Sequence, residues 1–197
     1  MNPEIYLDMD GLLVNLFDTL GHKFFNKPYK QLTLKQKKQI KKVWLDKERF
    51  VSHFGPIESF FESLEPFGEN GDLTKTIVAT VIEQFESYNI LTHPTALDPL
   101  GCKKGKQKWI KTHLPYPPTK VCFAQNKSDY ATTNNIPNIL IDDYLPYIEV
   151  WKAKGGYAIQ MRTDSFASTE DLKEFLYKEL SAAKKTIQKQ FVDFPKK

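Results

Sequence analysis

The sequence predicts a doubly wound α/β fold, a Rossmann-like parallel sheet with helices on both faces. Short apolar runs alternate with longer segments of helical periodicity, which is the pattern of repeated strand–helix units. The runs are almost continuously apolar, as in strands that are buried on both faces. The five predicted strands are residues 4–8, 88–92, 120–124, 138–142 and 156–160.

Helices are predicted between and after these strands. Segment 73–85 carries apolar residues at four-residue spacing, which gives a helix one buried face. The last helix begins near Thr169, where a threonine precedes two acidic residues. The remaining predicted helices are residues 104–113 and 144–153.

Residues 15–66 interrupt the alternation of strands and helices. No strand is predicted there, and the segment is helical, aromatic and lysine-rich. Because it follows the first strand directly, we interpret it as a small helical cap inserted over the sheet edge. The α/β core domain would then consist of residues 1–14 and 67–197.

Composition limits the classes of function. The net charge of +4, from 28 basic and 24 acidic residues, is too small to indicate nucleic acid as a partner. Cys102 and Cys122 lack the spacing of a metal site. No leader peptide and no apolar run of about 20 residues is recognised, so we expect a cytoplasmic protein without a membrane partner. A homodimer is compatible with the sequence, which does not determine the oligomeric state.

Four carboxylates are predicted to meet at one edge of the sheet. Asp8 and Asp10 end the first strand, and Asp142 and Asp143 end the fourth. Ligands of open α/β sheets bind at the carboxyl ends of strands. Since like charges disfavour each other's ionisation, such a group calls for a cation. Oxygen ligands favour Mg²⁺, whereas zinc would want His or Cys.

The same residues suit the transfer of a phosphoryl group. A carboxylate such as Asp8 can attack phosphorus and form an aspartyl-phosphate. Asp10, two residues on, projects to the same side and can act as acid and then as base. Thr92 ends the second strand and Lys127 follows the third, where both could bind phosphate oxygens.

Simpler interpretations exist for each of these residues, and for Asp142–Asp143 it is the N-cap of the helix that follows. Asp-x-Asp-Gly alone is usually a turn, but a second acidic strand end favours a metal–phosphate site. A β-branched residue such as Thr92 at a strand end needs no function. Lys127 also has competitors for the phosphate. They are Lys103, Lys104, Lys106 and Lys120.

Taken in order, these motifs resemble the haloacid dehalogenase (HAD) superfamily of phosphohydrolases. The resemblance rests on the Asp-x-Asp-Gly strand end, Thr92, Lys127 and Leu-Ile-Asp-Asp, and covers about residues 6–160. The segments 60–66 (Phe-Phe-Glu-Ser-Leu-Glu-Pro), 90–94, 108–110 and 126–128 resemble the 5'(3')-deoxyribonucleotidases more closely.

The resemblance implies a role for each matching residue. Asp8 would be the nucleophile and Asp10 the acid/base, with Thr92 and Lys127 on the phosphate. Mg²⁺ would be bound by Asp8, the Asp10 backbone carbonyl and one aspartate of the pair Asp142–Asp143. In part by resemblance, we expect the strand order 5-4-1-2-3.

Three further residues are predicted to contact the substrate, and each also has a purely structural interpretation. Phe60 and Phe61 align with a base pocket of the resembled family, but could be the cap's own core. Two residues depart from the pattern: His93 replaces a serine, and Tyr144 stands where an arginine is common. His93 is predicted to bind phosphate, with the orientation of a loop as the alternative.

The sequence therefore predicts a Mg²⁺-dependent phosphatase that acts on a small phosphate ester. The first substrate class to consider is the nucleoside 5'-monophosphates, including the deoxyribonucleotides. One rival is a phosphatase of the same superfamily acting on a sugar phosphate, a phosphoprotein or a nucleic-acid end. A rival of another class is a non-catalytic module that binds nucleic acid or phosphate through the lysine-rich cap and tail.

Overall fold

The computed structural model describes residues 3–192, with side chains from residue 3 to residue 189, so the last residues of the lysine-rich tail lie outside the described part. Its centre is a five-stranded parallel sheet in the order β3-β2-β1-β6-β7. This order confirms the predicted one. The strands are β1 (Ile5–Leu7), β2 (Asn89–Thr92), β3 (Lys120–Phe123), β6 (Ile139–Asp142) and β7 (Tyr157–Gln160).

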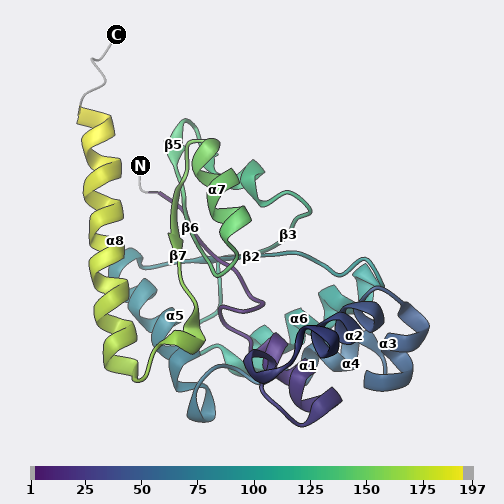
Figure 1. Cartoon of the computed structure of the whole chain (residues 1–197). Coiled ribbons are helices and arrows are strands. Elements are labelled where there is room, and N and C mark those ends of the chain that lie inside the picture. The colour runs from purple at the N-terminus through teal and green to yellow at the C-terminus, as the bar shows by residue number, and fades with distance from the viewer. Residues whose placement is uncertain (1–2, 193–197) are drawn as a thin grey trace.

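Helices cover both faces of this sheet (Figure 1). α5 (Asp72–Phe85) and α8 (Thr169–Val192) pack against each other and share one apolar cluster with Leu7 and Ile90. α7 (Leu145–Ala153) packs on the opposite face through Ile148 and Trp151, against Tyr6. The doubly wound arrangement predicted from the sequence is therefore present.

A helical segment, residues 16–62, lies between β1 and α5. It consists of α1 (Leu16–Phe25), α2 (Leu34–Trp44), α3 (Lys47–Phe54) and α4 (Ile57–Glu62). These helices gather at the end of the sheet toward which β1 and β6 run (Figure 1). Their aromatic side chains pack together, with Phe50 and Phe60 at a centroid distance of 5.0 Å. The short helix η1 (Tyr29–Gln31) joins α1 to α2.

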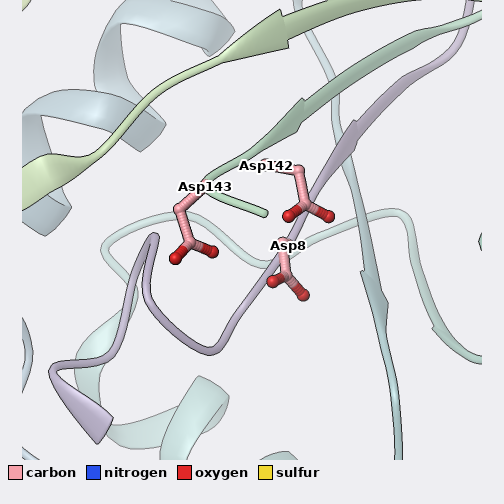
Figure 2. A group of neighbouring side chains, drawn as sticks. All are labelled: Asp8, Asp142 and Asp143. Carbon is pink, nitrogen blue, oxygen red and sulfur yellow. The ribbon is translucent and has the colours of Figure 1, made fainter. Parts of the chain in front are cut away.

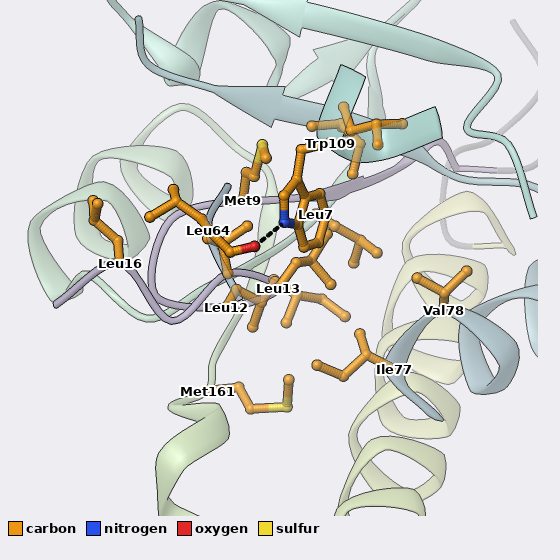
Figure 3. Close-up of a cluster of buried hydrophobic side chains, with 14 of the residues drawn as sticks. Leu7, Met9, Leu12, Leu13, Leu16, Leu64, Ile77, Val78, Trp109 and Met161 are labelled. Atoms are coloured by element: carbon orange, nitrogen blue, oxygen red, sulfur yellow. Dashed lines mark hydrogen bonds between the residues drawn. The ribbon is translucent and has the colours of Figure 1, made fainter. Parts of the chain in front are cut away.

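α6 (Pro99–His113) joins this helical segment to the sheet. It starts five residues before the predicted helix because Asp98 caps it, accepting a hydrogen bond from Gly101 N at 2.9 Å. A side chain at Gly105 could not be accommodated, since its Cβ would lie 2.3 Å from Glu58 O of α4. Trp109 of α6 donates to Leu64 O at 2.7 Å (Figure 3).

The other elements are short. η2 (Glu69–Gly71), η3 (Lys127–Tyr130) and η4 (Thr163–Ser165) are 3₁₀ helices. The strands β4 (Thr132–Thr133) and β5 (Ile136–Pro137) form an antiparallel pair. Within the described residues, no helix has the length and apolar character that crossing a membrane requires.

Buried threonines fix the loop that follows β1. The chain turns sharply at Gly11, whose φ is +88°, and Gly11 N donates to Val14 O at 3.0 Å. Thr163 donates its hydroxyl to Leu12 O at 2.6 Å, and Thr74 donates to Leu13 O at 2.7 Å. Each bond satisfies a buried carbonyl that the turn would otherwise leave without a partner.

This anchoring predicts a stability effect for Thr74→Val. The substitution keeps the side-chain volume but deprives Leu13 O of a donor and Phe67 N of its acceptor, the Thr74 hydroxyl at 2.9 Å. Leaving such groups unsatisfied should lower the free energy of unfolding by about 1–3 kcal/mol. Urea denaturation checks this, with Thr76→Val on the same helix as the control. Equal effects of the two substitutions would contradict the anchoring role.

Candidate functional site

Three carboxylates meet at the carboxyl ends of the two central strands. Asp8 follows β1, whose ladder is extended by Asp8 N donating to Ile141 O at 3.0 Å. Asp142 is the last residue of β6, and Asp143 follows it. One carboxylate oxygen from each of the three lies within 4.8 Å of the others, and the side chains point toward one another (Figure 2).

Lys127 joins two of these carboxylates. Its Nζ lies 2.7 Å from Asp8 Oδ1 and 2.7 Å from Asp142 Oδ2, and only 2% of the side chain is exposed. Burial lowers the pKa of Lys127, but the charges of Asp8 and Asp142 and their hydrogen bonds outweigh burial and raise it above its usual value. The ammonium is therefore a fixed positive charge beside Asp8.

Asp142 and Asp143 occupy different positions. Asp142 is fully buried, and both of its oxygens are engaged: Oδ2 by Lys127, and Oδ1 by Tyr144 N at 2.8 Å. Asp143 is half-buried and lines a cavity. Its carboxylate packs on Gly11, where a Cβ would come within 2.5 Å of it. Asp143 is therefore the member of the pair that is available to a ligand.

The acidity of this pair shows the electrostatic cost of the cluster. Burial, followed by the neighbouring charge of Asp8, raises the pKa of Asp142 to about 7. The same two causes, in the same order, raise the pKa of Asp143 to about 7. Both carboxyls would ionise more readily beside an added cation.

Asp10 does not belong to the cluster of three carboxylates. Its Oδ2 accepts a hydrogen bond from Lys106 at 2.5 Å, and its Oδ1 is buried without a partner. Burial raises the pKa of Asp10, the Lys106 charge opposes this, and the Asp8 charge adds to it. Burial and the Asp8 charge therefore favour the protonated form of Asp10, and the Lys106 charge favours the ionised form.

Lys106 is a site residue that the sequence identified only as a competitor of Lys127. It comes from α6, is fully buried, and also donates to Thr92 Oγ1 at 2.7 Å and to His93 O at 3.1 Å. It thereby joins the end of β2 to the loop after β1. Its placement in the middle of an amphipathic helix gave no local signal of this role.

Thr92 and His93 lie at the end of β2, beside the carboxylates. Thr92 is fully buried and accepts from Lys106. His93 lines the cavity, and its Nδ1 is buried without a partner. His93 therefore contributes to the cavity wall and has one buried ring nitrogen without a partner among the described residues.

The cavity above Asp8 has a volume of about 400 Å³. Its charged lining residues are Asp8, Asp10, Lys41, Lys127 and Asp143, and most of the other lining residues are aromatic or aliphatic. The aromatic lining residues are Phe17, Tyr29, Trp44, Phe61, Tyr144 and Tyr147. A molecule with a charged group and an apolar or planar remainder fits this division.

The two phenylalanines of the predicted base pocket lie differently. Phe61 lines the cavity, whereas Phe60 does not and packs among Phe50, Phe54 and Trp44. Phe60 thus has the alternative position considered from the sequence, in the core of the helical segment. The other aromatic lining residues could not be identified from the sequence, because nothing in a lone aromatic residue distinguishes a lining position from a core position.

Comparisons with known proteins add little to this geometry. No protein-family model matches the chain, and no curated protein sequence matches it. Among solved structures, one similar chain is a HAD family enzyme from Bacteroides thetaiotaomicron, in complex with magnesium and inorganic phosphate. The identity is 13% and the TM-score 0.43, over 85% of this chain and 98% of that one. At this identity and TM-score, the similarity does not establish a family or a function for this chain.

Proposed function

We propose that this protein is a Mg²⁺-dependent phosphomonoesterase of the haloacid dehalogenase type that hydrolyses nucleoside 5'-monophosphates, deoxyribonucleotides included. The observation that supports this best is the environment of Asp8. Its carboxylate is paired with a fixed cation, Lys127, lies within 4.8 Å of a carboxylate oxygen of Asp143, and lines a cavity with many aromatic residues.

Asp8 is the proposed nucleophile. Lys127 holds Oδ1, and among the described residues Oδ2 has no hydrogen-bond partner. Attack by Asp8 forms an aspartyl O–P bond while the P–O bond to the leaving group breaks. Lys127 would balance the negative charge that grows on the phosphoryl oxygens. Thr92 and His93, at the end of β2, are the remaining candidates for phosphate contacts.

Asp10 is the proposed acid and base. Its proton passes to the leaving oxygen in the first step, which gives the free alcohol. In the second step Asp10 takes a proton from water, the water oxygen bonds to phosphorus, and the aspartyl O–P bond breaks. Asp8 is regenerated and inorganic phosphate is released, so one water molecule is consumed for each ester.

The donor set fits Mg²⁺. All three side chains of the cluster offer carboxylate oxygens, and no His or Cys belongs to it, which suits a hard dication. Asp8, Asp143 and the backbone carbonyl of Asp10 are the proposed ligands. Asp142 would not bind the ion directly, since both of its carboxylate oxygens already accept hydrogen bonds from Lys127 and Tyr144 N. When bound, the ion would neutralise charge on the phosphoryl group.

The aromatic walls favour a nucleotide. A volume of about 400 Å³ lies within the usual range for small-ligand sites, and planar bases stack on aromatic faces. A sugar phosphate would leave these walls largely without a partner. Residues 15–66, which supply Phe17, Tyr29, Trp44 and Phe61, would act as the cap, with residues 1–14 and 67–197 as the core. A cytoplasmic location is also part of this proposal.

The nucleophile assignment predicts the behaviour of Asp8→Asn. The amide cannot form the acyl-phosphate, so turnover should fall by about 10⁴-fold or more while the fold is retained. Hydrolysis of p-nitrophenyl phosphate, with circular dichroism of the same samples, measures both. Asp171→Asn, an exposed aspartate of α8, is the control. Near-normal turnover by Asp8→Asn would refute the proposed mechanism.

The substrate assignment can be tested with a panel of phosphate esters. Nucleoside 5'-monophosphates should be hydrolysed with a higher kcat/KM than sugar phosphates, a phosphoserine peptide or a 5'-phosphorylated oligonucleotide, and EDTA should stop every reaction. A preference for another ester would replace the nucleotidase assignment. Salt-dependent binding of nucleic acid without hydrolysis of any ester would favour the non-catalytic rival.

The metal site predicts a pH-dependent stability. In EDTA, folded Asp142 and Asp143 keep protons up to about pH 7, whereas in the unfolded chain they lose them near pH 3.9. The Tm should therefore fall as the pH rises from about 4 to about 7. Because Mg²⁺ binds the ionised carboxylates, its stabilising effect should be larger at about pH 8 than at about pH 5.

Asp143→Asn is the matched variant for this measurement. It removes one raised pKa and one proposed ligand, so both the pH slope and the shift caused by Mg²⁺ should decrease. Thermal unfolding with EDTA or Mg²⁺ measures both quantities. An Asp143→Asn protein with the wild-type slope and the wild-type Mg²⁺ shift would contradict the assignment.

A further inference from the structure

We propose that a second cavity, which adjoins the one above Asp8, binds a phosphate group that is not hydrolysed. The inference rests on the proposed function and deepens it, since it identifies nucleoside 3',5'-bisphosphates as substrates that bind more tightly than the monophosphates. The 5'-phosphate of such a nucleotide would lie at Asp8, and the 3'-phosphate would lie in the second cavity.

The second cavity shares a wall with the first. Its volume is about 510 Å³, which lies within the usual range for small-ligand sites. The residues that line both cavities are Phe17, Tyr29, Asp143 and Tyr144. Since Asp143 also belongs to the carboxylate cluster at Asp8, the second cavity reaches the place of the proposed reaction. A substituent on a ligand at Asp8 could therefore enter it.

Two lysines on the wall of the second cavity carry charges that no carboxylate compensates directly. Lys30 belongs to η1 and Lys37 to α2. Among the described residues, no salt bridge includes either lysine. Lys37 is half-buried, and its Nζ lies 5.0 Å from the ring centroid of Tyr29. Both ammonium groups are therefore available to an anion.

The acidic residues of the second cavity have other partners. Three acidic and three basic residues line it, so their pairing decides which charges can serve a ligand. Asp164 is paired with Arg162, at 3.0 Å between Oδ2 and Nη2. Asp18 accepts a hydrogen bond from Tyr29 N at 2.7 Å. The third, Asp143, belongs to the carboxylate cluster. The two lysines are therefore the charged groups that remain for a ligand.

The helices around this cavity strengthen the attraction for anions. Residues 16–44, from the start of α1 to the end of α2, contain eight lysines and one acidic residue. This stretch has a net charge of +7 in a chain whose net charge is +4. A cleft beside such a concentration of one sign attracts ions of the other sign. A phosphate group, with several charged oxygens, suits two lysines best.

Hydrolysis of a bisphosphate follows the proposed mechanism. The aspartyl O–P bond forms as the bond between phosphorus and the 5'-oxygen breaks, and water then releases the phosphate from Asp8. One water molecule is consumed, and the products are the nucleoside 3'-monophosphate and inorganic phosphate. A phosphate group can also reach the second cavity on a separate molecule, for which inorganic phosphate is the probe.

The experiment compares thymidine 3',5'-bisphosphate with thymidine 5'-monophosphate. In the wild-type protein, kcat/KM should be about 10-fold higher for the bisphosphate, the effect of one hydrogen bond between charged groups. In Lys30→Met/Lys37→Met, this ratio should fall to about 2-fold or less, because the additional phosphate has lost its partners. Steady-state kinetics with the two nucleotides measures the ratio directly.

Lys35→Met/Lys38→Met is the matched control. It removes the same charge from two exposed lysines of α2 that line neither cavity, so it should keep the wild-type ratio. An equal decrease of the ratio in both double variants would show a general effect of net charge and would overturn the inference.

Inorganic phosphate distinguishes the two sources of the second phosphate group. If a separate phosphate binds while p-nitrophenyl phosphate occupies the site at Asp8, inhibition has a noncompetitive component that Lys30→Met/Lys37→Met removes. Purely competitive inhibition, together with the higher kcat/KM for the bisphosphate, assigns the second cavity to the substrate. Purely competitive inhibition with equal kcat/KM values for the two nucleotides would refute a second phosphate site.

Binding to Asp8→Asn separates this inference from the phosphatase assignment. By isothermal titration calorimetry, this variant should bind the bisphosphate about 10-fold more tightly than the monophosphate, and adding Lys30→Met/Lys37→Met should remove the difference. If the wild-type protein hydrolyses no ester but this difference persists, the proposed function fails and the second site stands. If the monophosphate is hydrolysed but both nucleotides bind equally, the inference fails and the phosphatase assignment stands.

Discussion

The contact of Lys127 with Asp8 and Asp142 is the interaction on which the site depends. Three carboxylates at one sheet edge repel one another, and the raised pKa values of Asp142 and Asp143 record that repulsion together with burial. Lys127 compensates part of the charge from inside the protein. Removing one partner of such a buried pair generally costs about 3–5 kcal/mol. A divalent ion would compensate the remaining charge.

The sheet topology makes this concentration of charge feasible. β1 is the central strand, and β6 lies directly beside it in the sheet. The acidic residues that end these two strands are therefore neighbours, and no long loop is needed to bring them together. Gly11 leaves space for the Asp143 carboxylate, and the Thr74 and Thr163 hydroxyls fix the turn that follows β1. The backbone thus determines the positions of the carboxylates before any ligand is bound.

The sequence predicted the elements that depend on short-range patterns of apolar and polar residues. Strand positions agree with the structure to within one residue at each end, because continuous apolar runs mark buried parallel strands. The meeting of Asp8 with Asp142 and Asp143 followed from the shared carboxyl edge. Lys106 and the lining position of Phe17 could not be predicted in this way, since both depend on contacts between segments that are far apart in the sequence.

The same packing explains why the site can combine charge with apolar walls. α4 reaches α6 closely at Gly105, and this contact brings Phe61 beside Lys106 and over the cavity. Apolar walls exclude water, and electrostatic interactions are stronger where water is excluded. In the proposed phosphatase, a helical segment that supplies aromatic walls would therefore also strengthen the action of Lys127 on a bound phosphate. Substrate recognition and charge stabilisation would then depend on one and the same interface.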